Sequence, residues 1–100
     1  MAKLLLYSIK DSRVGLYEPP FAFSHEGQAT RFWTDVVNDP EKRSAACRYP
    51  NEFALHKIGE FDSETGEVLQ ESPPVFVAFG TDVFAKNQPA LPLAPTGRES

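Results

Sequence analysis

The sequence predicts an α+β fold, in which one amphipathic helix packs across a largely antiparallel sheet in a single small domain. Three observations predict this fold. A chain of 100 residues forms one small core, one stretch has apolar residues at helical spacing, and several short runs rich in β-branched and aromatic residues lie between turn residues. The expected order is two strands, the helix and three further strands. We expect the domain at residues 1–85 and a proline-rich tail at residues 86–100.

The first two strands are predicted near the amino end of the chain. Residues 3–10 (KLLLYSIK) form a short apolar run, which is typical of a central strand covered on both faces. After a turn, residues 14–17 predict a second short strand, which two prolines then end. Side chains alternate along a strand, so Tyr7 lies on the opposite face from Leu4 and Leu6. If those leucines pack under the helix, Tyr7 faces solvent.

The helix is predicted at residues 25–38, where the apolar residues fall on one face. The apolar positions at i, i+3, i+4, i+7 and i+8 are Ala29, Phe32, Trp33, Val36 and Val37. Ser24 is the expected N-cap, because its hydroxyl can accept a hydrogen bond from an exposed amide of the first turn. We expect the apolar face of this helix to pack against Leu4, Leu6 and Ile58.

The second half of the chain predicts a loop and three strands. Residues 41–48 are polar and indicate a surface loop with at most one helical turn. Strands are expected at 53–61 and 67–70, joined by a turn that contains a glycine, and at 75–79 before Gly80. Beyond this point, prolines at every third position favour an extended, polyproline-like tail.

Composition excludes several classes of protein. Ten Lys and Arg against fourteen Asp and Glu give a net charge of −4, which is the wrong sign for coating nucleic acid by bulk attraction. Residues 1–57 nevertheless hold eight of the ten basic residues and seven of the fourteen acidic ones. No apolar run approaches the roughly 20 residues that cross a bilayer, and the single cysteine, Cys47, cannot form an intramolecular disulfide. We therefore expect a cytoplasmic protein with no membrane contact.

The candidate catalytic residues form no known constellation. His25, His56 and Cys47 are single residues without the spacing of a metal site or a nucleophile and base. The carboxylates around Gly66 lack the glycine and glutamate positions of a calcium-binding EF-hand. No glycine motif predicts a phosphate cradle. We expect no enzyme activity, no metal and no cofactor.

A mixture of aromatic and basic residues in the first two strands indicates a different function. Single-stranded nucleic acid stacks its bases on exposed rings while nearby cations neutralise its phosphates. The residues expected to form such a site are Tyr7, Lys10, Arg13, Tyr17 and Arg31. Further basic candidates are Lys42, Arg43, Arg48 and Lys57. On composition alone, the favoured interpretation is that the two tyrosines are packing residues of the sheet with solvated hydroxyls.

Three segments together resemble a known family. They are LYSIKDSRVGLYEPPF at residues 6–21, FWTDVVNDP at 32–40 and IGEFDSETGEV at 58–68. They resemble the small non-structural protein, the fifth viral protein, of gokushovirus-type Microviridae, phages with small circular single-stranded DNA genomes. The resemblance implies a phage protein of the host bacterial cytoplasm that is absent from the mature capsid. It also implies DNA binding in genome replication, at the change from duplex synthesis to single strands for packaging.

Two hypotheses about function follow. The first is a non-enzymatic protein that binds single-stranded DNA and forms a homodimer through the strand at residues 75–79. The alternative is a protein-interaction module that regulates the phage replication or packaging machinery, or a host factor, without binding DNA. Deletion of residues 86–100 separates the two, because it should spare DNA binding and abolish a partner that is bound through the tail.

Overall fold

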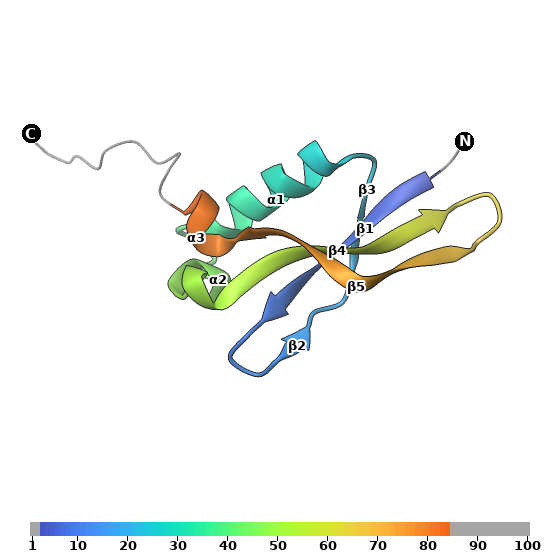
Figure 1. Cartoon of the computed structure of the whole chain (residues 1–100). Coiled ribbons are helices and arrows are strands. Elements are labelled where there is room, and N and C mark those ends of the chain that lie inside the picture. Colours follow the sequence, from blue (N-terminus) through green and yellow to red (C-terminus); the bar gives the residue numbers. More distant parts are fainter. Residues whose placement is uncertain (1–2, 85–100) are drawn as a thin grey trace, which may run out of the picture.

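One antiparallel sheet of five strands forms the frame of the protein, and helix α1 lies across one of its faces (Figure 1). The computed structural model describes residues 3–84. The strands are β1 (Lys3–Asp11), β2 (Leu16–Tyr17), β3 (Phe21–Phe23), β4 (Phe53–Asp62) and β5 (Val68–Phe79). The helices are α1 (Glu26–Asn38), α2 (Ala45–Arg48), the short 3-10 helix η1 (Pro50–Glu52) and α3 (Gly80–Val83). The predicted α+β fold is therefore confirmed.

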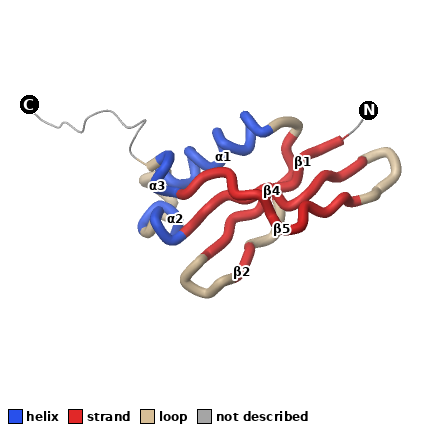
Figure 2. The backbone as a smooth tube through the Cα atoms, in the orientation of Figure 1, coloured by secondary structure: helices blue, strands red, loops and turns tan. Residues whose placement is uncertain are grey.

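The strands follow the order β2-β1-β4-β5, with β1 and β4 at the centre (Figure 2). The central position predicted for the first strand is confirmed. One edge of β1 pairs with β4. Its other edge pairs with two short strands, with β2 at Lys10 and Asp11 and with β3 at Leu5 to Tyr7. The sequence did not predict β3, which has only three residues and follows two prolines. All of these pairs are antiparallel.

Strand β5 is one strand of 12 residues where the sequence predicted two. Pro73 and Pro74, which we expected to separate the strands, lie within it. Proline cannot donate a hydrogen bond to a ladder, so it is tolerated in strands that have a free edge. At the edge of the sheet, β5 meets this condition. The pairing with β4 shifts its register near these prolines and resumes on either side of them.

The core lies between α1 and the sheet. Trp33 and Val37 are completely buried and pack in one cluster with Tyr7, Ile9 and Leu55 of the two central strands. The other predicted residues of the helical stripe belong to the same cluster, with Ala29 buried and Phe32 and Val36 partly buried. The amphipathic face predicted for the helix is therefore confirmed.

The predicted partners of the helix are wrong. Leu4, Leu6 and Ile58 are absent from the core cluster, and Leu5, Tyr7 and Ile9 of the opposite parity take their place. A shift of one residue moves every side chain of a strand to the other face. Because residues 4–6 are all leucine, this apolar run does not show which parity faces the helix.

The helix ends also differ from expectation. The N-cap of α1 is His25 without a capping side chain, and the Ser24 amide instead donates to Gln28 Oε1 at 2.8 Å. The expected polar loop after α1 ends in the single turn α2, which Ser44 caps. Gly80 begins α3 and packs so closely on η1 that a β-carbon would overlap the carbonyl oxygen of Pro50.

The described residues contain no helix that is both long and apolar enough to cross a membrane. The predicted proline-rich tail at residues 86–100 lies outside the described residues.

Candidate nucleic-acid interface

Tyr7 lies in the core and cannot stack on a base. Its side chain is 0% exposed, its ring meets Phe23 at 6.0 Å between centroids, and its hydroxyl donates to Glu26 Oε1 at 2.9 Å. The prediction that Tyr7 faces solvent is wrong for the same reason as the predicted helix partners. The odd-numbered side chains of β1 point toward α1, and Tyr7 is one of them.

Burial of the Tyr7 phenol predicts a loss of stability at alkaline pH. Burial raises its pKa above the usual value of 10.0, and the hydrogen bond to Glu26 and the charge of that carboxylate act in the same direction. The neutral phenol stabilises the folded state, so this contribution is complete below pH 10 and is lost as the pH rises beyond it. Urea unfolding at increasing pH should show a steeper loss of stability for the wild type than for Tyr7→Phe. Tyr49→Phe, at an exposed tyrosine, is the control and should follow the wild type.

The face of the sheet opposite α1, here called the outer face, carries a row of aromatic rings. Directly paired residues share a face, and the pairs Lys10–Tyr17, Ser8–His56 and His56–Phe76 place their side chains there. The ring centroids of successive members lie 5.5 Å apart for Tyr17 and His56, 5.8 Å for His56 and Phe76, and 4.7 Å for Phe76 and Phe79. These four residues form the aromatic row, which crosses the sheet from β2 to β5.

Three members of the aromatic row are well exposed. Tyr17 is 42% exposed, and Phe76 and Phe79 are each 48% exposed. His56 is half-buried between its neighbours, and burial lowers its pKa, with the charge of Lys10 acting in the same direction. The imidazole is therefore mainly neutral at pH 7 and serves as an aromatic link in the row.

The sequence predicted Tyr17 and missed His56, Phe76 and Phe79. The sequence placed Phe76 and Phe79 only in a strand at residues 75–79, and it showed His56 as an isolated histidine. No residue spacing in the sequence predicts the row, because the contacts between its rings depend on the register of β4 against both β1 and β5. One feature of the sequence did point to these rings: no second long helix was predicted that could cover the strand at residues 75–79.

The carboxylates at the paired positions of the sheet lie on the face that α1 covers. By their pairing, Asp11, Glu60 and Asp62 lie on the side of α1, opposite Phe53, Leu5 and Lys3 respectively. The paired positions of the outer face carry no carboxylate. Lys10 lies on this face, with its ammonium 5.5 Å from the centre of the Tyr17 ring. The outer face is thus free of carboxylates at its paired positions although the chain carries a net charge of −4.

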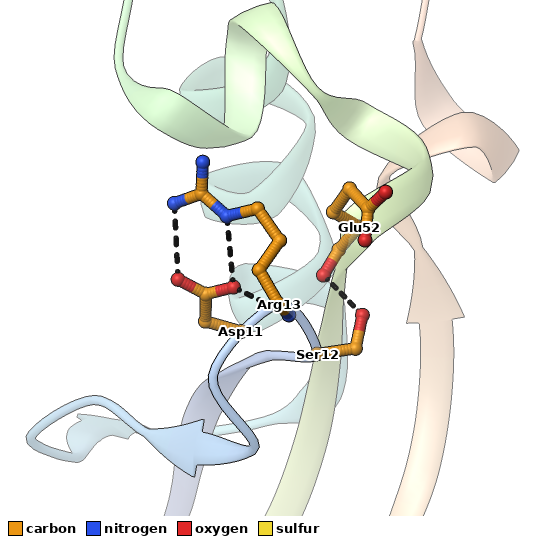
Figure 3. A network of polar contacts seen from close by, with 4 residues as sticks. All are labelled: Asp11, Ser12, Arg13 and Glu52. Atoms are coloured by element: carbon orange, nitrogen blue, oxygen red, sulfur yellow. Dashed lines mark hydrogen bonds and ion pairs between the residues drawn. The ribbon is translucent and has the colours of Figure 1, made fainter.

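Arg13 is already engaged by a carboxylate. Its Nε and Nη2 each donate to an oxygen of Asp11 at 3.1 Å (Figure 3). The guanidinium also lies 5.3 Å from the ring centre of Tyr49. The hydrogen bond from Arg13 holds the pKa of Asp11 below its usual value. Beside it, the Ser12 hydroxyl donates to the Glu52 carbonyl oxygen at 2.6 Å. A phosphate would therefore have to compete with Asp11 for this guanidinium.

The remaining predicted cations do not converge on Tyr17. Lys57 pairs with Tyr7 on the side of α1, and its Nζ lies 3.4 Å from carboxylates of both Glu60 and Glu71. Arg31 is exposed on α1, and Lys42 lies in the loop that follows this helix. Arg43 and Arg48 line a separate cleft beside α2. Of the nine candidate residues named from the sequence, the structure brings together Lys10 and Tyr17 on the outer face.

A family model described as the Phage ORF5 protein matches residues 4–83. The chain belongs to the phage ORF5 protein family. Protein ORF5 of Chlamydia phage 1 is 32% identical over 65 residues, which cover 63% of this chain and 68% of that protein. The family resemblance predicted from the three sequence segments is confirmed. No solved structure matches the chain.

The three segments build the frame of this ORF5 family protein. Residues 6–21 contain most of β1 and all of β2, residues 32–40 contain the second half of α1, and residues 58–68 form the turn from β4 into β5. The match to the family model also includes Phe76 and Phe79, which lie outside the three segments. The complete aromatic row therefore lies in the part of the chain that matches the family model.

The ORF5 family protein shows no metal centre in residues 3–84. No group of three or more His, Cys, Asp or Glu side chains in this range is placed to hold a metal ion. His25 ends a loop at the start of α1, whereas Cys47 lies on α2 and lines the cleft beside it. The aromatic row, whose rings are in contact from β2 to β5, is therefore the candidate functional site.

Proposed function

We propose that this ORF5 family protein binds single-stranded DNA on the outer face of its sheet. The observation that carries the proposal is the aromatic row, in which Tyr17, Phe76 and Phe79 are exposed and joined through His56. Every base has a π-face, so a row of exposed rings can stack successive bases with little dependence on sequence. The row lies on an open sheet, where an extended strand has access to each ring.

Lys10 supplies the charge for this proposal. Its ammonium lies over the Tyr17 ring and forms no ion pair with a carboxylate among residues 3–84. A phosphate that follows a base stacked on Tyr17 can therefore meet an available cation. Each neutralised phosphate of a single strand adds about −0.7 to the slope of log K against log salt. One or two such contacts predict a shallow slope of about −0.7 to −1.4, in keeping with an acidic protein.

Fluorescence anisotropy with a labelled oligo-dT tests the proposal. Two or three stacked bases contribute about 1–3 kcal/mol each. With the phosphate contacts, we expect dissociation constants of about 10–100 µM at low salt. A labelled duplex of the same length is the control, and it should bind more weakly because its bases are not free to stack. Absence of oligo-dT binding at about 100 µM protein contradicts the proposal.

Binding of this kind suits a protein that acts on viral single strands. We place the activity in genome replication, at the change to single-strand synthesis and packaging, in the host bacterial cytoplasm. Membership of a phage family supports this placement. No catalytic step is required, because the protein would act by holding the strand.

A protein partner is the second candidate, and exposed apolar residues on β5 favour it. Val68, Leu69 and Val75 are all exposed on this edge strand. A second copy of the chain that pairs along residues 75–79 would cover part of this edge and form a homodimer. Sedimentation equilibrium measures this association. A variant without residues 86–100 that keeps oligo-dT binding but loses its role in infected cells would favour the alternative of a regulatory partner.

A further inference from the structure

A cleft beside α2 is lined by two arginines and by no carboxylate. It has a volume of about 540 Å³ and lies between the end of α1, α2 and the end of α3. Its lining includes Asn38, Arg43, Cys47, Arg48, Tyr49 and Phe84. Arg43 and Arg48 are exposed and form no ion pair with a carboxylate within the described part of the chain. The cleft therefore favours an anionic ligand.

The walls of the cleft are held in place by the fold. Asn38 Nδ2 donates to the carbonyl oxygens of Thr34 at 2.8 Å and Val83 at 3.1 Å, so it joins the end of α1 to α3. Arg43 has a φ of 46°, an uncommon conformation for a residue other than glycine. Its amide donates to the Asp39 carbonyl oxygen at 3.2 Å, which ties the turn to the end of α1. The ligand would meet a largely preformed site.

The cleft also offers a flat ring next to its cations. Tyr49 is 46% exposed, and the guanidinium groups of Arg13 and Arg48 lie 5.3 Å and 5.8 Å from the centre of its ring. Arginine forms two parallel hydrogen bonds to a phosphate, and an exposed tyrosine can stack on a base. A nucleotide offers both groups at once, whereas an acidic peptide offers only the anion.

Helix α3 connects the cleft to the aromatic row. Phe79, the last ring of the row, is the N-cap of α3, and Phe84 at its other end lines the cleft. A helix rises about 1.5 Å per residue, so these two positions are separated by about 7.5 Å along its axis. Gly80, the residue after Phe79, packs against Pro50, the residue that follows Tyr49. The row and the cleft are therefore neighbours.

We propose that the cleft binds the part of the same DNA strand that runs beyond the aromatic row. A phosphate lies between Arg43 and Arg48, and its base stacks on Tyr49. This inference rests on the proposed function, because it extends the strand that the outer face holds. It predicts that long strands bind more tightly than strands that cover the row alone.

The experiment compares two oligo-dT lengths, about 4 and about 12 nucleotides, with the full chain by anisotropy. Arg43→Gln with Arg48→Gln should weaken binding of the long strand about tenfold and reduce its salt slope by about 1.4, since two phosphate contacts are affected. Binding of the short strand should not change. Lys3→Gln, at an exposed lysine at the start of β1, is the control for a lost positive charge and should leave both strands unaffected.

The outcomes separate this inference from the proposed function. If the wild type binds the long strand and the double variant binds it equally, with the same salt slope, the cleft inference is overturned alone. If the wild type binds neither strand, both proposals fail. A labelled oligoglutamate is the anion control, and an equal, arginine-dependent affinity for it would show a site for carboxylates and overturn the assignment to a nucleotide.

Discussion

Replacement of Trp33 by alanine is expected to unfold the protein or to lower its melting temperature severely. Trp33 is completely buried at the centre of the core cluster, and its Nε1 donates to the Phe79 carbonyl oxygen at 3.3 Å. Truncation of a buried tryptophan costs about 3–5 kcal/mol, a large part of the total stability of a small domain. For a domain of this size, this corresponds to about 10–40 °C in melting temperature.

Thermal unfolding followed by circular dichroism measures the effect of Trp33→Ala. Val14→Ala is the control, because Val14 is exposed on the turn between β1 and β2 and should tolerate truncation. A melting temperature of Trp33→Ala within a few degrees of the wild type would show that α1 does not hold the sheet in the described way. The bond to Phe79 also predicts that a partly folded variant loses the arrangement of the aromatic row.

The double variant Tyr17→Ala with Phe76→Ala is expected to abolish measurable binding to oligo-dT. Each stacked base is worth about 1–3 kcal/mol, so the loss of two rings weakens binding by about 30-fold to 10⁴-fold. Both side chains are exposed, so the melting temperature should change little. The result would separate a loss of contact from a loss of fold.

Anisotropy and thermal unfolding are to be measured on the same samples of this variant. The matched control is Val14→Ala with Leu16→Ala, which removes two exposed apolar side chains next to Tyr17. It should bind like the wild type. Tyr17→Phe keeps the ring and should also keep the affinity. Undiminished binding by the alanine double variant would exclude the aromatic row as the DNA site.

Local patterns of the sequence were enough to predict the elements that build the frame. The helical stripe around Trp33 identified α1, and the apolar run at residues 3–10 identified the central strand β1. The patterns failed where two orientations of a strand fitted the same apolar run. Three consecutive leucines left the parity of β1 open, and the burial of Tyr7 followed from the parity that the structure adopts.

The candidate site could be predicted only in part, because it depends on partners far apart in the chain. Tyr17 and His56 are joined through β1, and no spacing in the sequence shows this contact. Lys57 was predicted as a free cation, but its partner Glu71 comes from the next strand across a register shift. The ion pair between Arg13 and Asp11 is easier to predict from the sequence, because the two residues lie within one turn.

The two prolines on the edge of β5 have a consequence for the behaviour of the protein at high concentration. A strand edge with an unbroken series of amide hydrogens can recruit further chains one after another and grow into fibrils. Pro73 and Pro74 contribute no amide hydrogen, so this edge offers two short segments in place of one long template. The break disfavours open-ended stacking of copies, while each segment remains long enough for one limited contact.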